Sequence, residues 1–440
     1  MEIGGKQGSR LTGRLFSKLM DMLAEDFEAT GEGFQLTVEF IIATLLWVDD
    51  VVTCVDGEKN QNNILEKINK FAINHKLQWG KEKCRVMRFG KHNEDPKEWK
   101  IGKMAITETD SYKYLGDTLT SDGKNAKNLS ERKSKMKIST STIHSIAANE
   151  ILNQIETSIL LDLHEKINIP GLLVNSEAWS LSKGEKDELE KIETQTLRDL
   201  FDLPVHTPTP AILYSLGTLY TSLRLDMKQL IYLHKLLNRH PTHWTHKTLT
   251  TLTDKKIGWS KSISDTLVRH KLPSDFQAIK NTRHIDWKRN VTKAIEKENL
   301  ERLKRDCHKT ENGTQVAKTK TKSIINDIFK HEYKREPNKE LLNRTKHDAK
   351  TIIIARYGML ECGTNFKGTM RESCSICNVL DDESHRLNFC KKYRTINFYE
   401  CDEKVDFNEI YSTDQLILRK LLPKIEKVWN TRNANGSMNT

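Results

Sequence analysis

The sequence predicts an α+β protein in which a region of strands and helices is followed by a mainly helical region. Two apolar runs, Phe40–Val48 and Val51–Val55, flank a pair of carboxylates and predict a β-hairpin. Leucines at four-residue spacing over residues 10–29 predict an amphipathic helix before it. Helical periodicity dominates again over residues 184–200 and 222–238. Strands and helices in this order build a small sheet with helices on one face.

Further elements follow in chain order. An apolar stripe from Ile64 to His75 predicts a second helix, after which we expect a strand at residues 84–89 and a strand pair formed by residues 99–107 and 112–119. The basic stretch Lys124–Lys137 leads into a long helical pattern that continues to Ile167. Later segments are a proline-marked junction, a threonine- and histidine-rich loop, two charged helices and a polar tail; they cover residues 204–210, 240–253, 287–304, 324–334 and 430–440.

Length and charge limit the class of protein. The 440 residues exceed what one core normally holds, so we expect more than one domain. The formal net charge of +11 favours salt-sensitive association with nucleic acid, although a basic protein needs no such partner. The sequence has no apolar run of membrane-spanning length, no secretory signal and no disulfide-like cysteine framework. We therefore expect no membrane partner and an intracellular protein of the cytoplasm and/or nucleus, and we make no prediction of its oligomeric state.

The adjacent acids Asp49 and Asp50 are the first candidate site. Two carboxylates at the tip of a buried hairpin would be costly without a counter-charge, and a divalent metal would supply one. The alternative is an ordinary solvated turn, because aspartate is a common turn residue.

Four segments resemble, in order, the later motifs of a reverse transcriptase palm. They are Gly5 to Phe16, Trp47-Val48-Asp49-Asp50, Leu77 to Phe89, and Tyr112 to Gly116. The last resembles the primer-grip hairpin, whose turn we expect at Asp122-Gly123. Downstream, Pro170 to Leu181 is similar to a segment of non-LTR, LINE-type (jockey-like) retrotransposons, as are Leu197 to Pro204 and Leu216-Gly217.

The resemblance implies an RNA-directed DNA polymerase. Asp49 and Asp50 would be catalytic carboxylates that hold Mg²⁺ or Mn²⁺, and the partners would be an RNA template and a DNA or RNA–DNA duplex. The expected nucleotide- or nucleic-acid-binding residues are Gln7, Gly8, Lys83, Tyr114, Leu115 and Gly116. The implied domains are a partial palm (1–122), a helical thumb or connection region (123–240), a basic helical linker region (241–345), a zinc-binding module (346–400), and a C-terminal helix with a disordered tail (401–440).

A second candidate site is a cysteine and histidine cluster near the C-terminus. Cys374, Cys377, His385 and Cys390 form the pattern C-x₂-C-x₇-H-x₄-C, which suits one tetrahedral Zn²⁺. It resembles the Cys-Cys-His-Cys module of LINE-type elements. A closed set of four ligands implies a structural role, and Cys362 or Cys401 could compete as ligands. The alternative is reduced structural cysteines beside a chance histidine.

The sequence also departs from the family pattern. Trp47 stands where tyrosine or phenylalanine is usual, Val48 replaces alanine, Gly80 replaces asparagine and Gly13 replaces proline. The Gln-Gly segment begins so early that we expect the fingers and the strand with the first catalytic aspartate to be absent. Because two-metal catalysis needs carboxylates from separate strands, we expect a truncated remnant without polymerase activity of its own.

Two other functions stay open at this stage. One is a non-enzymatic, zinc-containing RNA- or DNA-binding protein derived from a retroelement. The other is a nuclease that uses acids after the cysteine cluster, namely Asp402, Glu403, Asp406 and Glu409. That segment shows no Pro-Asp followed by a spaced acid and lysine, which weighs against the nuclease.

Overall fold

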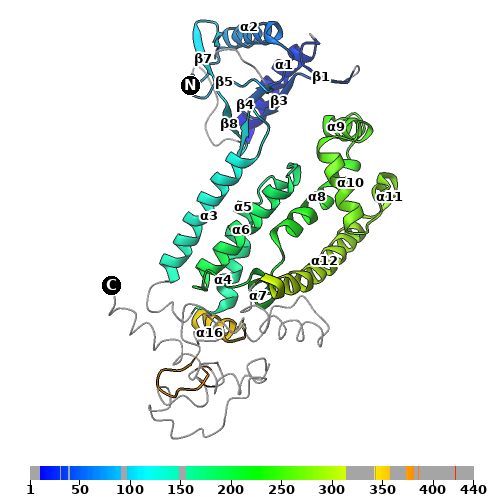
Figure 1. Cartoon of the computed structure of the whole chain (residues 1–440). Coiled ribbons are helices and arrows are strands. Elements are labelled where there is room, and N and C mark those ends of the chain that lie inside the picture. The colour runs from blue at the N-terminus through cyan, green and yellow to red at the C-terminus, as the bar shows by residue number, and fades with distance from the viewer. Residues whose placement is uncertain are drawn as a thin grey trace. The chain divides into compact units, whose positions relative to one another are not determined.

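The computed structural model divides the chain into two compact units. Unit 1 consists of residues 1–128 and 233–265, and unit 2 of residues 129–232 and 266–440. The described residues are 10–29, 31–37, 40–90, 97–147, 155–313, 341, 343–356, 373–380, 385 and 422. Both units are described separately below (Figure 1). The domain limits drawn from the sequence stay a prediction.

The first four strands of unit 1 form two antiparallel pairs. β1 (Phe34–Thr37) pairs with β2 (Phe40–Ile42), and β3 (Thr44–Trp47) pairs with β4 (Asp50–Thr53), both antiparallel. The N–H of Cys54 donates to the carbonyl of Ala43, and the Cys54 carbonyl accepts the N–H of Phe34 from β1, both at 2.9 Å, which joins the two pairs. The predicted carboxylate hairpin is therefore confirmed as a pair of strands.

Two further hairpins follow in the same unit. β5 (Arg85–Val86) pairs in parallel with β7 (Met104–Glu108), and β7 pairs antiparallel with β6 (Glu98–Ile101). β8 (Ser111–Tyr114) and β9 (Asp117–Thr120) form a separate antiparallel pair. The predicted strand segments are thus present. Residues 99–107 and 112–119 were expected to pair with each other, but each segment belongs to a hairpin of its own, β6–β7 and β8–β9.

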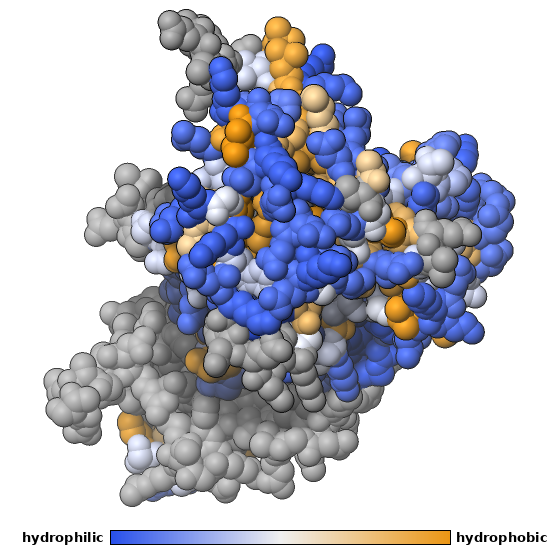
Figure 2. Space-filling view, turned by 90° about the horizontal axis from the view of Figure 1, so that it is seen from above, coloured by the Kyte–Doolittle hydropathy of each residue, from blue (hydrophilic) through white to orange (hydrophobic). Residues whose placement is uncertain are grey.

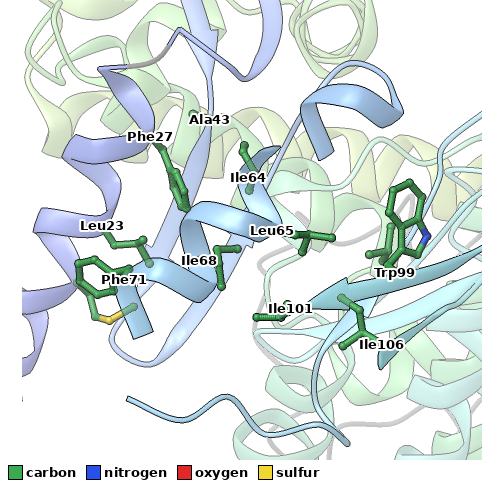
Figure 3. Close-up of a cluster of buried hydrophobic side chains, with 12 residues drawn as sticks. Leu23, Phe27, Ala43, Ile64, Leu65, Ile68, Phe71, Trp99, Ile101 and Ile106 are labelled. Carbon is green, nitrogen blue, oxygen red and sulfur yellow. The ribbon is translucent and has the colours of Figure 1, made fainter. Parts of the chain in front are cut away.

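Helices cover these strands and supply the core of unit 1. α1 (Arg10–Glu28) contacts β3, and α2 (Glu58–Asn74) contacts β6. Figure 3 shows side chains of α2 between those of α1 and those of the β6–β7 hairpin. The buried residues of this core include Leu23, Phe27, Ile64, Leu65, Ile68, Phe71, Trp99, Ile101 and Ile106. The predicted α+β class is confirmed in this general form.

Unit 1 is completed by a helix from much later in the sequence, α9 (Trp244–Asp254). Residues 240–253 were expected to form an exposed loop; residues 240–243 are non-helical, but residues 244–253 are helical, so the prediction is wrong for them. The threonine-rich segment is helical, and Leu249 and Thr251 within it are buried. The hydroxyls of several other threonines donate to the backbone carbonyl four residues earlier. Threonine can satisfy its own hydroxyl in this way within a helix.

The remaining helices belong wholly or in part to unit 2. They are α3 (Ala126–Ala147), α4 (Thr157–Leu163), the π-helix η2 (His164–Asn168), α5 (Ile169–Leu172), the short η3 (Ser176–Ala178), α6 (Lys183–Leu200), α7 (Thr209–Leu216), α8 (Thr221–Leu237), α10 (Gly258–Arg269), α11 (Phe276–Asn281), α12 (His284–Gly313) and α16 (Lys346–Arg356). The predictions for residues 184–200, 222–238 and 287–304 are confirmed. Ser182 and Glu185 close a capping box that explains where α6 begins.

A chain of hydrogen bonds crosses the interior of unit 2. Ser139 on α3 donates to Asn168 at 2.6 Å, and the Asn168 amide lies 3.4 Å from Nδ1 of His164. His164 Nε2 lies 3.4 Å from Oε1 of Glu193 on α6, and Thr221 at the start of α8 donates to the other oxygen of Glu193. Because buried polar groups need partners, this chain fixes the mutual register of four helical segments.

On one face of the molecule, the described surface is largely polar (Figure 2). Figure 2 shows mostly hydrophilic side chains on the visible face, with hydrophobic side chains in separate groups. Among the described helices, none combines the length and the apolar character that crossing a bilayer requires.

Candidate functional site

The first candidate site is the tip of the β3–β4 hairpin. Trp47 pairs with Asp50, so the connecting turn consists of Val48 and Asp49 alone. Val48 has a φ of 58°, a left-handed conformation that is unfavourable for a β-branched residue. Two-residue hairpins of this kind normally place glycine or asparagine at such positions. The tip is therefore a strained turn.

The tip is exposed, which corrects one premise drawn from the sequence. Trp47 is 63% exposed and Val48 49% exposed, and the side chains of Asp49 and Asp50 are also exposed. Both carboxylates are thus hydrated, and burial does not force a metal upon them. The hairpin is held from below, where Leu46 and Val51 pack against the core of unit 1. The two carboxylates therefore face solvent at the tip of a hairpin whose base is packed against the core.

Three of the sequence motifs meet beside Asp50. The phenol of Tyr112 on β8 donates a hydrogen bond to the carbonyl oxygen of Lys83, 2.9 Å away. Burial raises the pKa of the Tyr112 phenol, and the nearby negative charge of Asp50 raises the pKa further. The same two causes, in the same order, raise the pKa of Tyr114. Asp50, the Lys83 segment and the β8 strand are therefore close neighbours.

The β8–β9 hairpin presents a second tip. Tyr114 pairs with Asp117, so Leu115 and Gly116 form the turn, with φ values of 45° and 93°. Two successive positive φ values characterise a type I′ turn. The turn of this hairpin is therefore not at Asp122-Gly123; a separate turn lies there, after β9, in which the N–H of Gly123 donates to the carbonyl of Thr120 at 2.9 Å. The Leu-Gly pair was overlooked because leucine is an unusual residue in this conformation.

The structure describes only some of the predicted nucleic-acid-binding residues. Lys83 has an exposed side chain and lies in a turn, Tyr114 is half-buried, and Leu115 is 44% exposed. Of these residues, Tyr114 is close enough to Asp50 for the carboxylate charge to raise the pKa of its phenol. Gln7 and Gly8 lie outside the described residues.

A third acid does not join the aspartate pair in the described part of the chain. The one group there of three or more histidine, cysteine or acidic side chains with converging ligand atoms is the cysteine–histidine cluster. Two-metal phosphoryl transfer normally uses carboxylates from more than one strand. Within the described residues, the aspartate pair of this hairpin therefore does not meet that requirement.

The second candidate site is formed by Cys374, Cys377 and His385. Their ligand atoms all lie within 4.8 Å of one another, and Cys374 and His385 are buried. The segment after Cys374 is a tight turn, in which the N–H of Asn378 donates to the Cys374 carbonyl and the Cys374 N–H donates to the Val379 carbonyl, both at 2.8 Å. This turn brings the two thiols to the same side.

The three residues could hold a metal ion. Two thiols and one imidazole are donors that Zn²⁺ favours, and tetrahedral zinc would hold such atoms about 3.5–4 Å apart. The predicted fourth ligand, Cys390, lies outside the described residues, as do Cys362 and Cys401 and the acids Asp402, Glu403, Asp406 and Glu409. Cys54 and Cys84 are half-buried and do not belong to the cluster, and burial raises the pKa of both thiols.

A buried charge cluster in unit 2 was not predicted from the sequence. Asp226 on α8 is fully buried and lies 3.1 Å from Lys186, 2.7 Å from Arg269 and 2.9 Å from Nε2 of His270. Burial by itself would raise the pKa of Asp226, but the His270 hydrogen bond and the two neighbouring cations outweigh it and hold that pKa below its usual value. The partners are distant in sequence, so no spacing rule could reveal them.

We compared the sequence with protein-family models and with curated proteins. No family model and no curated protein matches it.

Proposed function

We propose that unit 1 is the later part of a reverse transcriptase palm from a non-LTR, LINE-type retrotransposon, with thumb-like helices in unit 2. The observation that supports this proposal best is the meeting of three motifs. Asp50, the Lys83 turn and the Tyr112–Gly116 hairpin are far apart in sequence but adjacent in space. Chance resemblance of short motifs gives no reason for them to converge.

The chemistry follows from what the tip offers. Asp49 and Asp50 are exposed carboxylates that would bind Mg²⁺ or Mn²⁺ and bring it to the 3′ end of a primer. The adjacent β8–β9 hairpin would hold the primer strand through Tyr114, Leu115 and Gly116. The RNA template and the RNA–DNA duplex are the proposed partners.

We do not propose that this chain polymerises DNA by itself. A pair of adjacent carboxylates on one hairpin supplies one side of a two-metal site, and the described residues add no third acid. We propose that this chain by itself binds a primer–template without extending it.

We further propose that the cysteine–histidine cluster binds one structural Zn²⁺, with Cys390 as the fourth ligand. Two thiols and an imidazole already converge there. Zinc bound by four protein ligands has no open position for substrate, so its contribution would be to the stability of this segment.

The second candidate function is a non-enzymatic, zinc-containing protein that binds RNA or DNA. The exposed and unaccompanied aspartate pair favours it, because nucleic-acid binding needs no metal at the hairpin. The two candidates differ in where the primer end would lie. The primer end would contact the hairpin tips in the palm proposal, whereas it would have no fixed place in the non-enzymatic protein.

Primer extension and binding test the proposal together. The purified chain, given an RNA template with a recessed DNA primer and Mg²⁺ or Mn²⁺, should bind the hybrid without extending it. Its affinity should fall steeply with salt, as phosphate contacts require. Template-directed synthesis that is abolished by Asp49→Ala and unchanged by the control Asp21→Ala would contradict the incomplete-enzyme proposal. A protein without measurable affinity for the hybrid would contradict both candidates.

A further inference from the structure

α9 reaches unit 1 from a distant part of the sequence and is firmly docked there. It contacts β1, and the ammonium of Lys255, just after the helix, donates to the carbonyl oxygen of Leu36 at 2.8 Å. Leu249 on its inner face is buried. These contacts fix the position of α9 on the β1–β2 pair.

The start of α9 and the neighbouring strand β2 together carry flat rings and a cation. Trp244 is 49% exposed, and the ring of His243 lies beside it, with centroids 6.1 Å apart and planes inclined by 25°. One turn later, Lys247 Nζ lies 5.4 Å from the centre of the Phe40 ring on β2. His243 is also the N-cap of α9, since its side chain accepts the N–H of Thr245 at 3.3 Å. The rings are thus held in place by the fold.

We propose that Phe40, His243, Trp244 and Lys247, here called the α9 platform, bind an unpaired nucleic-acid strand. Aromatic side chains stack on bases of any sequence, and nearby cations attract the phosphates between them. Residues 239–256 contain four lysines and arginines against one acid, so the surrounding charge complements a polyanion. The inference rests on the proposed nucleic-acid function and gives the single strand a place separate from the hairpin tips.

The chemistry of the platform favours a nucleic acid over a lipid surface. A helix that lies on a bilayer needs a continuous apolar face toward it. The apolar Leu249 of α9 faces inward, and the outward residues after Lys247 include Thr250 and Asp254. Flat rings next to cations without a broad apolar face suit bases and phosphates better.

Fluorescence anisotropy with two labelled probes tests the assignment on the full chain. The probes are a 15-nucleotide oligouridylate and an RNA–DNA hybrid duplex without overhangs. Trp244→Ala should weaken binding of the oligouridylate at least about fivefold, the lower end of what losing one stacking side chain costs. Trp244→Phe should restore most of the affinity, and hybrid binding should change less than twofold. Ile73→Ala, at an exposed apolar residue of α2, is the matched surface control.

The outcomes distinguish failure of the platform from failure of the proposed function. If the wild type binds both probes and Trp244→Ala changes neither affinity, the platform is wrong and the proposed function stands. If the wild type binds neither probe, both fall. A 4-thiouridine probe that crosslinks to the peptide containing Trp244 supports the platform without relying on a variant. Loss of binding to anionic phospholipid vesicles in Trp244→Ala, with unchanged oligouridylate binding, would overturn it in favour of a membrane surface.

Discussion

The phenol of Tyr112 donates a hydrogen bond to the backbone carbonyl of Lys83, 2.9 Å away and 29 residues earlier in the chain. This bond joins the turn before β5 to the β8–β9 hairpin, next to Asp50. The proposed site therefore depends on a main-chain contact of Lys83, whereas the resemblance drew attention to its side chain.

Replacing Tyr112 by phenylalanine should loosen this connection. The variant loses one hydrogen bond and leaves a carbonyl to water, so unfolding of unit 1 should become easier by about 0.5–1.5 kcal/mol. Urea unfolding followed by circular dichroism measures the change. Lys113→Ala, at an exposed residue of the same strand, should stay within about 0.5 kcal/mol of the wild type. Equal effects of the two variants would contradict the role of the bond.

Replacing Val48 by glycine should stabilise the protein. The left-handed backbone at Val48 costs on the order of 1–3 kcal/mol, and glycine adopts it freely at an entropic cost of about 0.5–1 kcal/mol. We expect a net gain of about 0.5–2 kcal/mol in the same urea experiment. Val51→Gly is the control, since Val51 is in a strand and packs on the core, and it should destabilise. A loss of stability in Val48→Gly would show that the turn is not strained.

The buried cluster around Asp226 predicts acid sensitivity. The pKa of Asp226 is lower in the folded protein than its ordinary value near 3.9, so the carboxylate contributes stability above about pH 4 that is lost as the pH falls further. Asp226→Asn should reduce the slope of melting temperature against pH below pH 4. It should also destabilise at pH 7 by about 3–5 kcal/mol, because Lys186 and Arg269 lose their counter-charge. An unchanged slope would contradict this account.

The cysteine–histidine cluster predicts a metal content close to one Zn²⁺ per chain. Protein purified without chelators should contain this zinc by elemental analysis, and the double variant with Cys374→Ser and Cys377→Ser should lose it. Cys54→Ser should retain it, since Cys54 lies outside the cluster. Zinc-free wild-type protein, or a double variant with full zinc content, would refute the site.

Much of the fold was predictable because its signals are local. Four-residue apolar spacing predicted α1, α6 and α8, and the apolar runs around Asp49 predicted the β3–β4 hairpin. α9 was missed because threonine favours loops in general, whereas here buried contacts decide the structure. The turn at Leu115-Gly116 was missed because leucine rarely adopts a positive φ.

The candidate sites were predictable to a lesser degree. Short spacing identified Cys374, Cys377 and His385, because neighbouring ligands on one tight turn must converge. The exposure of Asp49 and Asp50 could not be read from flanking apolar residues, since alternate residues of a hairpin face different sides. The clusters around Asp226 and Glu193 depend on contacts between distant helices, which no local pattern encodes.

The position of the primer end tests the central claim most directly. A DNA primer that ends in 4-thiothymidine, annealed to an RNA template, would be bound by the purified chain, irradiated and analysed by mass spectrometry of the crosslinked peptides. The proposed palm predicts crosslinks at the two hairpin tips, residues 47–50 and 112–117, that weaken when Leu115 is changed to Asp and persist in the control Ile73→Ala. Crosslinks spread over other surfaces, with none at either tip, would contradict the claim.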